Sequence, residues 1–345
     1  MTDFATLTEI VLPGIVEPDG LLVQHRPVPA PGRGEVLVQM LATGVSFSEQ
    51  SMRRGLYPGM PKFPFVPGYD IVGTVTALGE GVDPALLGRR IAAVTKTGGW
   101  STHALVAAHS VVPIADDLDP AEVETLLLNG ITASQMLYRK AKATAGQTIL
   151  VHGANGGVAN MLVQLARHSG IRVIGTASPR HHDALREFGV EPVDYHDPDL
   201  EATVRGMAPS GVDAVFDQLG EKSFRRSFDL LAPRGTLVAY GLQNQLDEPG
   251  NMIVTFTKMY SKLIGWSLRP NRGRTAVFYN FWGGKLVRPA AFRRRLAADL
   301  TQLVALLAAG TITGRVGRRM TLTDAAKALA AAESGTVSGK IVLVP

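Results

Sequence analysis

The clearest sign of a binding site in the sequence is a group of glycine residues that follows an apolar segment. Residues 148–152 form a short β-branched and apolar run, typical of a buried parallel strand, and a glycine-rich turn follows directly. Glycines lack the Cβ atoms that would keep a diphosphate away from the backbone. Residues 158–169 then have helical periodicity, and the free amides at the helix start would point at an anion. We therefore predict a dinucleotide site formed by Gly153, Asn155, Gly156, Gly157 and Val158.

The cofactor can be predicted from the residues beyond the next strand. The turn reads Gly-x-x-Gly-x-x-Ala, so its context has to support the interpretation. A second strand, 172–176, ends about 20 residues on, where a carboxylate would bind the ribose of NADH. The chain has Ser178 and Arg180 there, and guanidinium pairs with phosphate through two hydrogen bonds, so NADPH is the predicted cofactor. The alternatives are a turn that only packs strand on helix and a solvated Arg180.

The overall composition is that of an ordinary globular protein of 345 residues, 46% hydrophobic and 19% charged. This length accommodates two domains. The net charge of +5 is modest and its basic residues are scattered, so nucleic acid is not an expected partner. The absence of cysteine excludes disulfides, thiolate catalysis and thiolate zinc sites. Without a secretion signal or an apolar run of about 18 residues, a cytoplasmic protein that does not enter the membrane is expected.

The pattern of elements changes near residue 129. Up to residue 128, short strands separated by Gly and Pro predict a β-rich domain, and residues 129–268 alternate helices and apolar strands, which predicts a doubly wound parallel sheet. Residues 269–345 are expected to return to the first domain. The clearest strands expected in the first domain are 36–42, 71–78, 89–95 and 103–107. Those expected in the second are 148–152, 172–176, 190–195, 214–218, 236–241 and 262–267, with helices 130–142, 158–169 and 222–231. The closing segment is expected to contain helices 290–309 and 323–335 and the strand 340–344.

The order of these motifs resembles that of the medium-chain dehydrogenase/reductase superfamily. The resemblance rests on the segments 44–57, 67–75, 78–81, 150–158 and 339–343, and is closest to the zinc-independent quinone oxidoreductase-like branch, which is related to enoyl reductases. It implies an α/β protein in which a Rossmann domain is combined with a discontinuous β-rich GroES-like catalytic domain. It also implies NADPH as hydride donor, a cleft between the two domains, and a homodimer, with the strand near Ile264 as the expected contact.

No metal site is expected from the same resemblance. The zinc-using members have Cys in the region of Ser46 and Gly-His-Glu where this chain has Gly68-Tyr69-Asp70. Neither sulfur nor imidazole is offered at these positions. Without a metal to polarise an alkoxide, reduction of an already polarised, conjugated acceptor is favoured over alcohol oxidation.

The resemblance also assigns roles to single residues. Tyr57 matches the tyrosine that related enoyl reductases are proposed to use as proton donor, and its alternative is a packed residue at the rim of the site. Ser46 replaces an Asn of the branch that orders the nicotinamide site, and its shorter side chain reaches less far. Further cofactor contacts are implied for Thr132, Tyr195, Gly241 and Leu242, with helix capping or strand-end packing as alternatives.

The predicted activity is hydride transfer from NADPH to a quinone, enone or other activated alkene. The substrate would be small, apolar and conjugated, because residues 243–282 are rich in aromatic side chains that either line its site or pack in a core or subunit interface. Two alternatives stay open. One is an enoyl-thioester reductase of a biosynthetic pathway, and the other is an NADPH-binding structural or interaction protein with low turnover.

Overall fold

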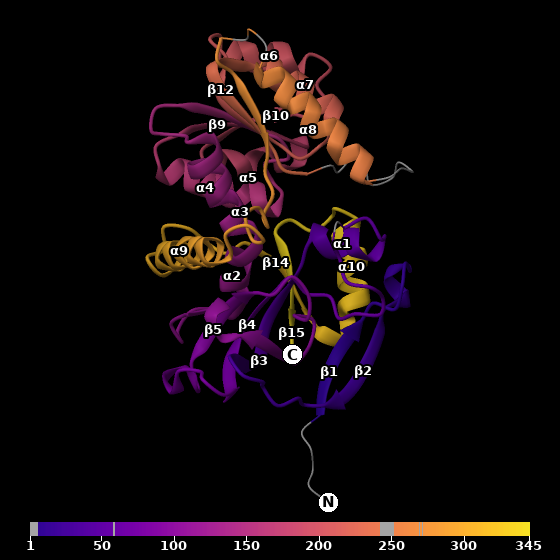
Figure 1. The fold of residues 1–345 in the computed structure, drawn as a ribbon. Helices are drawn as coiled ribbons and strands as arrows, with labels where there is room; N and C mark the ends of the chain where they lie inside the picture. Colours follow the sequence, from indigo (N-terminus) through magenta and orange to yellow (C-terminus); the bar gives the residue numbers. More distant parts are fainter. Residues whose placement is uncertain (1–5, 58, 242–251, 269, 271) are drawn as a thin grey trace, which may run out of the picture. The chain divides into compact units, whose positions relative to one another are not determined.

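The computed structural model describes residues 6–57, 59–241, 252–268, 270 and 272–345. The chain divides into two compact units, Met1–Ile131 with Arg288–Pro345, and Thr132–Val287 (Figure 1). The return to the first unit thus lies at Arg288, later than residue 269, because a further strand of the second sheet precedes it.

The first unit contains a seven-stranded sheet that combines strands from the first third of the chain with the last two strands. Its strand order is β14-β15-β3-β4-β5-β7, and β6 pairs with β3. The C-terminal strand β15 runs antiparallel to β3, which makes this unit discontinuous in sequence. A separate antiparallel pair is formed by β1 (Thr6–Val11) and β2 (Leu22–Pro27). The sheet strands are β3 (Glu35–Val45), β4 (Asp70–Leu78), β5 (Arg90–Val94), β6 (His103–Ala107), β7 (Val111–Pro113), β14 (Val316–Thr321) and β15 (Lys340–Val344).

Alternation along the strands forms the core of this unit. Val36, Val38 and Met40 on β3 are fully buried at every second position, as expected for a strand with one face on the core. Trp100 is also fully buried, and its indole Nε1 donates to the Gly44 carbonyl at 2.9 Å. Burial of each such side chain contributes about 1.5–3 kcal/mol. The helices of the unit are α1 (Phe47–Arg53), α2 (Pro120–Thr125), η4 (Leu126–Gly130), α9 (Pro289–Ala308) and α10 (Ala325–Glu333).

The second unit is built on a six-stranded parallel sheet with the order β10-β9-β8-β11-β12-β13. All six strands are parallel, but the order in which the chain adds them reverses at β8. The next two strands, β9 and β10, lie on one side of β8, and the later strands, from β11 on, lie on the other. Its strands are β8 (Thr148–Val151), β9 (Arg172–Ala177), β10 (Val190–Asp194), β11 (Val212–Asp217), β12 (Leu231–Ala239) and β13 (Thr275–Phe278). Its helical segments are α3 (Ile131–Ser134, which begins at the boundary), η5 (Gln135–Ala141), α4 (Gly157–His168), α5 (His182–Glu187), α6 (Leu200–Met207), α7 (Glu221–Asp229) and α8 (Met252–Leu268).

The parallel strands are buried by helices on both faces of the sheet. Side chains of α6, α7 and α8, among them Val204, Phe224 and Leu263, form one hydrophobic cluster with the strands. Right-handed crossovers place α4 and α5, which connect β8 to β10, on the opposite face. The predicted doubly wound architecture is therefore confirmed.

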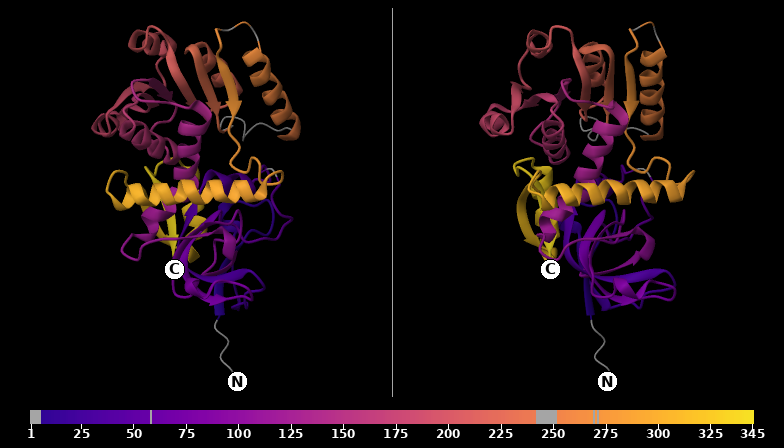
Figure 2. Two further views of the ribbon diagram at one scale, coloured as in Figure 1. Left: turned by 60° about the vertical axis from the view of Figure 1, so that its left-hand side comes forward. Right: turned by 90° about the vertical axis from the view of Figure 1, so that its left-hand side faces the viewer.

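The expected strand at 262–267 is wrong, because these residues belong to α8. Met259 and Leu263 are buried one helical turn apart, whereas Ile264 is 55% exposed. The last strand of the sheet is β13, and α8 lies beside it (Figure 2). Ser267 of α8 accepts a hydrogen bond from the Ala276 backbone N–H at 2.9 Å. A dimer contact through a strand at Ile264 is thus excluded, because no strand exists there.

None of the helices in the described ranges combines the length and the apolar character that crossing a bilayer requires.

Candidate functional site

The glycine turn lies at the carboxyl end of β8, where the chain direction across the sheet reverses. Gly153 has a φ of +61°, a left-handed conformation that favours glycine, and a Cβ there would collide with the Gln218 amide. The turn is held by the end of β9, because the Ala154 N–H donates to the Thr176 carbonyl at 2.9 Å. Ligands of doubly wound sheets bind at such a reversal point.

No side chain caps the start of the helix that follows the turn. Gly156 precedes the first residue of α4 and contributes no side-chain cap, and its N–H closes the turn on the Gly153 carbonyl at 2.9 Å. Asn155, Gly157 and Val158 are half-buried at this end of the helix. The amides of the first helical turn, together with the positive end of the helix dipole, form a surface suited to an anion such as a diphosphate.

The residues predicted for the adenine end lie at the carboxyl ends of the neighbouring strands. Ser178 follows β9 and is half-buried, and Arg180 is exposed, with its Nε 3.1 Å from His181 Nε2. Tyr195 follows β10, is 51% exposed, and donates its N–H to the Ala177 carbonyl at 3.4 Å. The structure thus brings these three residues to the same sheet edge as the glycine turn, with the guanidinium facing solvent.

Gly241 lies two residues beyond β12, on the other side of the reversal point. A Cβ on Gly241 would approach the Gln218 side chain to 2.9 Å, so this residue must be small. Gln218 also accepts a short hydrogen bond from the hydroxyl of Tyr240. Burial raises the Tyr240 pKa, and the Asp217 carboxyl raises it further. Leu242 falls outside the described residues.

Thr132 lies in a helical run whose hydrogen-bond pattern varies. It is 6% exposed and belongs to α3, between two segments, η4 and η5, with the wider π-helical pattern. Such segments are frequent at functional sites. The run begins with α2 at Pro120, ahead of the predicted start at residue 130, because Asp119 caps the amide of Ala121 at 3.0 Å.

Tyr57, the proposed proton donor, lies in the first unit and contacts a second tyrosine. Its hydroxyl oxygen is 2.6 Å from that of Tyr69, and the two rings pack edge to face with centroids 6.1 Å apart. Tyr69 is 2% exposed and its carbonyl accepts the N–H groups of Thr95 and Lys96. Lys96 Nζ donates to the Gly59 carbonyl at 2.6 Å. The loop that carries Tyr57 is therefore attached at two points to the segment around Tyr69.

Ser46 begins the helix that leads to Tyr57. Its Oγ accepts the Ser48 N–H at 3.1 Å and also bonds the Glu49 carboxyl, which in turn accepts the Ser46 N–H at 2.9 Å. This reciprocal capping box fixes the start of α1. The Ser46 hydroxyl thus already forms hydrogen bonds within the first turn of α1.

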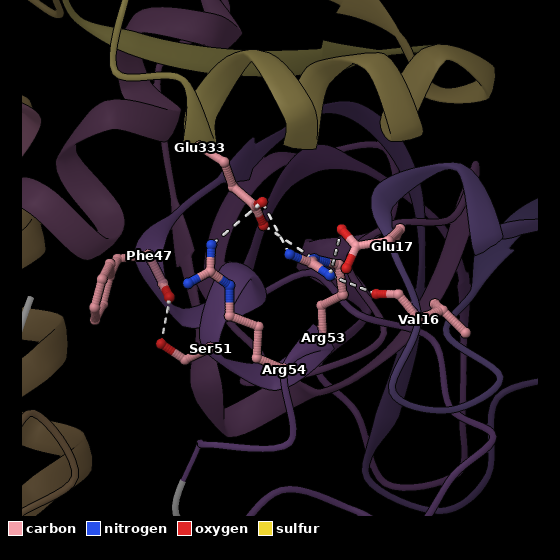
Figure 3. A network of polar contacts seen from close by, with 7 residues as sticks. All are labelled: Val16, Glu17, Phe47, Ser51, Arg53, Arg54 and Glu333. Atoms are coloured by element: carbon pink, nitrogen blue, oxygen red, sulfur yellow. Dashed lines mark hydrogen bonds and ion pairs between the residues drawn. The ribbon is translucent and has the colours of Figure 1, made fainter. Parts of the chain in front are cut away.

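The other end of α1 is fixed by buried arginine contacts (Figure 3). Arg53 is 4% exposed and binds both carboxylate oxygens of Glu333 on α10, at 3.0 and 2.9 Å. It also donates to the Val16 carbonyl, and Arg54 pairs with the same Glu333 at 3.5 Å. Such two-point pairs are directional and strong. They hold α1 against α10 and so define where the loop of Tyr57 begins.

A cluster of buried charges lies under α1, and we call it the acid–lysine cluster: Glu49, Asp70, Glu124 and Lys340. Lys340 Nζ is 3.2 Å from Glu124 Oε1, and Asp70 Oδ1 accepts the Gly44 N–H at 3.1 Å. Burial raises the pKa of Glu49 to about 7, although the Ser46 hydrogen bond and Lys340 oppose the shift. Burial also raises the pKa of Glu124 well above its usual value, against the attraction of Lys340. The sequence offered no local signal for this cluster, because its members are distant in the chain.

Gly68-Tyr69-Asp70 and Ser46 present a phenol, a carboxyl and a hydroxyl that bond within the protein. Over the described ranges, the histidine, aspartate and glutamate side chains form no group of three or more that could hold a metal ion.

The fold and the glycine turn define a class of protein, the nicotinamide-dependent oxidoreductases, and the comparisons give the family. Residues 32–116 match the model of the alcohol dehydrogenase GroES-like domain, and residues 189–343 match the model described as zinc-binding dehydrogenase. The human synaptic vesicle membrane protein VAT-1 homolog is 31% identical over 344 residues, which cover 97% of this chain and 86% of that protein. The chain therefore belongs to the medium-chain dehydrogenase/reductase superfamily, in its quinone oxidoreductase-like branch.

Other relatives carry names that refer to chemistry. Rat quinone oxidoreductase is 31% identical over 228 residues, or 64% of this chain and 68% of that protein. A mycobacterial protein solved in complex with NADPH is 28% identical, with a TM-score of 0.82 over 98% of this chain and all of that one. The quinone oxidoreductase of Pseudomonas syringae pv. Tomato is 26% identical, with a TM-score of 0.84 over the same shares.

Proposed function

We propose that the protein is a zinc-independent, NADPH-dependent reductase of quinones, enones or related activated alkenes. The observation that carries the proposal is the glycine turn at the reversal point of the parallel sheet, with the uncapped start of α4 beside it. Support for the phosphorylated cofactor comes from Ser178 and Arg180 at the same sheet edge and from the NADPH bound to the mycobacterial relative.

The residues at this edge fit the parts of a dinucleotide. The amides of Gly157 and Val158, at the start of α4, would bind the diphosphate, and Gly153 and Gly156 would let it approach the backbone because they have no Cβ. Ser178 and Arg180 would bind the 2′-phosphate, because the guanidinium is exposed and can exchange its contact with His181 for the phosphate. The remaining proposed contacts are Ser46, Thr132, Asn155, Tyr195, Gly241 and Leu242.

When bound, the nicotinamide supplies the hydride, and the protein has to manage the proton. Hydride addition to the β-carbon of a conjugated acceptor leaves negative charge on the carbonyl oxygen, and the α-carbon then requires a proton. Tyr57 is proposed to supply that proton, because a phenol stays protonated at neutral pH. A hydrogen bond donated by the Tyr69 hydroxyl would stabilise the phenolate that remains. Quinone reduction does not require this proton, since water can protonate a hydroquinone oxygen.

Cofactor choice is tested by exchanging the charge next to the ribose. Replacing Ser178→Asp together with Arg180→Ala puts a carboxylate where the 2′-phosphate is expected and removes its cation. The Kd for NADPH divided by the Kd for NADH should rise by at least about tenfold for each charge-assisted contact that is lost. Isothermal titration with both cofactors measures it, and Arg186→Ala on α5 is the matched exposed control. An unchanged ratio would show that neither Ser178 nor Arg180 contacts the 2′-phosphate.

The reaction is tested with NADPH and a panel of quinones, enones and enoyl thioesters. Turnover of quinones and enones supports the proposal, turnover of thioesters alone supports the enoyl-thioester reductase, and cofactor binding without turnover supports a low-turnover binding protein. Tyr57→Phe separates the substrate classes. Its enone kcat should fall by about 10²-fold or more, as for other general acids, while quinone reduction persists. Undiminished enone reduction would exclude Tyr57 as donor. The homodimer and the cytoplasmic location stay predictions, which light scattering and cell fractionation can check.

A further inference from the structure

A chain of buried hydrogen bonds runs behind the glycine turn. His152, directly before Gly153, has its Nδ1 3.2 Å from Thr176 Oγ1 and its Nε2 3.0 Å from Ser227 Oγ. Thr176 Oγ1 also accepts the Gly153 N–H at 3.1 Å. Ser227 Oγ donates to Asp217 Oδ2 at 2.7 Å, and Asp217 is completely buried. The chain therefore connects a carboxyl on β11 to the backbone of the turn through one imidazole ring.

The direction of every bond in this chain follows from its acidic end. An ionised carboxylate can only accept, and Asp217 receives the Leu219 N–H on Oδ1 and the hydroxyls of Ser223 and Ser227 on Oδ2. The Ser227 hydroxyl hydrogen is therefore used in the bond to Asp217, so the Ser227 oxygen must accept a hydrogen bond from His152 Nε2–H. The ring then has its lone pair on Nδ1, which accepts the Thr176 hydroxyl. That leaves the Thr176 oxygen to accept the Gly153 N–H.

A second proton on the ring would break this order. With Nδ1 protonated, Thr176 would have to accept from both the ring and Gly153, and its own hydrogen would lose its acceptor. Burial lowers the His152 pKa, the Asp217 carboxylate opposes the shift, Arg226 on α7 lowers the pKa, and Glu201 on α6 raises it. These are the charged groups that act on the ring from the elements packed around it, and the neutral ring is the favoured form.

We propose that His152 is a positioning residue for the cofactor: its neutral ring, with the proton on Nε2, orients Thr176 so that the glycine turn keeps its dinucleotide-binding conformation. Gly153 holds a left-handed φ of +61°, and its N–H is one of the two points where the turn is bonded to the end of β9. The inference rests on the proposed function in one respect, that the turn is where the dinucleotide binds. Cofactor affinity should consequently fall when the ring gains a proton.

The test measures NADP⁺ binding by isothermal titration between pH 5 and pH 8.5, because the oxidised cofactor is stable in mild acid. The 2′-phosphate also titrates, near pH 6, so each variant is compared with the wild type at every pH. His152→Gln keeps a donor and an acceptor but cannot titrate; it should bind about as the wild type at pH 8 and lose less affinity than the wild type as the pH falls toward 5. His109→Gln, an exposed histidine of the other unit, should follow the wild type.

Two further variants test the chain itself. His152→Phe and Thr176→Val remove the link to Gly153, and each should weaken NADP⁺ binding about tenfold at pH 8. Circular dichroism verifies folding, and if His152→Phe does not fold, Thr176→Val and His152→Gln decide. An affinity for NADP⁺ that is unchanged in Thr176→Val, together with a His152→Gln pH profile identical to that of the wild type, would overturn the inference.

A readout without cofactor separates this inference from the proposed function. Hydrogen exchange of the Gly153 amide should be slow in the wild type and in His152→Gln, and at least about tenfold faster in both Thr176→Val and His152→Phe. If wild-type protein bound no NADP⁺ while Gly153 exchange behaved in this way, the proposed cofactor site would be wrong and the positioning of the turn by His152 would stand. Equal exchange in all variants would contradict the positioning role, whatever the affinity.

Discussion

The two units contain buried polar groups that are arranged in opposite ways. In the second unit, the chain from Asp217 to Gly153 is ordered, and each hydroxyl and ring nitrogen has a defined donor or acceptor role. In the first unit, the acid–lysine cluster places three carboxyls against one ammonium. Glu124 and Lys340 form a buried ion pair, with Nζ 3.2 Å from Oε1, but no well-aligned hydrogen bond joins them. The stability of that cluster depends on the ion pair and on protons that Glu49 and Glu124 retain because burial raises the pKa of each.

The difference separates two uses of buried polarity. A fully bonded chain of short side chains fixes geometry, because reversing any member disturbs all the others. A charge cluster constrains side-chain geometry less, because an ion pair tolerates a range of angles. Its desolvation cost is large unless protonation of the carboxyls reduces the net charge. We therefore expect the first arrangement to control ligand affinity and the second to control mainly stability and its dependence on pH. Four predictions test this comparison.

Removing the cation of the acid–lysine cluster should have the largest effect. Lys340→Met leaves three buried carboxyls without a positive partner, and breaking such a buried pair costs about 3–5 kcal/mol. Urea unfolding at pH 7.5 measures the loss. Lys327→Met, which removes an exposed lysine paired with Asp324, is the control and should change stability little. The double variant Lys340→Met with Glu124→Gln should recover part of the loss; a further decrease would contradict the pairing.

The second prediction concerns Glu49, whose pKa burial raises to about 7 from 4.5. Between these values the folded chain holds a proton that the unfolded chain releases, so stability falls as pH rises from 4.5 through about 7. Glu49→Gln removes this dependence and keeps an oxygen acceptor for Ser46. Its stability relative to the wild type should therefore increase between pH 5 and pH 8, by up to about 3 kcal/mol at about 1.4 kcal/mol per pKa unit.

Denaturant unfolding at several pH values tests the Glu49 prediction, and Glu35→Gln, with a partly exposed carboxyl in the same unit, is the control. Parallel stability profiles of Glu49→Gln and the wild type would show that Glu49 is ionised at pH 5.

The contribution of His152 to the pH dependence of stability has the opposite sign. Its pKa is lowered by burial, so the unfolded chain binds a proton first and stability falls as pH decreases below 6.5.

The third prediction reverses the hydrogen-bond chain. Asp217→Asn conserves shape but places an NH₂ group where an oxygen has to accept from Ser223, Ser227 or Leu219. At least one buried group then lacks a partner, which costs about 1–3 kcal/mol. Chemical denaturation measures the loss, and ¹⁵N chemical shifts of the imidazole should show a change of the His152 tautomer. A wild-type tautomer in Asp217→Asn would mean that the carboxyl does not direct the chain.

Much of the second unit could be predicted from the sequence, because its signals are local. The glycine turn marked β8 and α4 to within one residue, since an apolar run, a turn and a helical period adjoin there. Two strands of the first unit, β6 and β15, also have the bounds that the sequence predicts. A short apolar run does not distinguish helix from strand, and this is why residues 262–267 were assigned to a strand although they belong to α8.

Other elements could not be found because their sequences lack periodicity. The strand β14 is largely exposed and carries consecutive arginines, so no alternation marks it. The site followed the same rule. Gly153 and Arg180 lie in a local motif, whereas the contacts of Tyr57 with Tyr69 and of Glu124 with Lys340 arise only after the sheet has formed. His152 was included in a strand by its sequence context, and nothing there indicated its bond to Ser227.

The last prediction sharpens the comparison within the second unit and has the smallest expected effect. Ser223 and Ser227 both donate to Asp217 Oδ2, at 2.6 and 2.7 Å, but only Ser227 also contacts His152. Ser223→Ala and Ser227→Ala should each lose about 1 kcal/mol of stability, because each removes one hydrogen bond to a charged acceptor that keeps two others. Only Ser227→Ala releases the ring, so only it should weaken NADP⁺ binding at pH 8. If both variants weakened binding equally, the Asp217 carboxyl itself, and not the ordered chain through the imidazole, would determine the conformation of the turn.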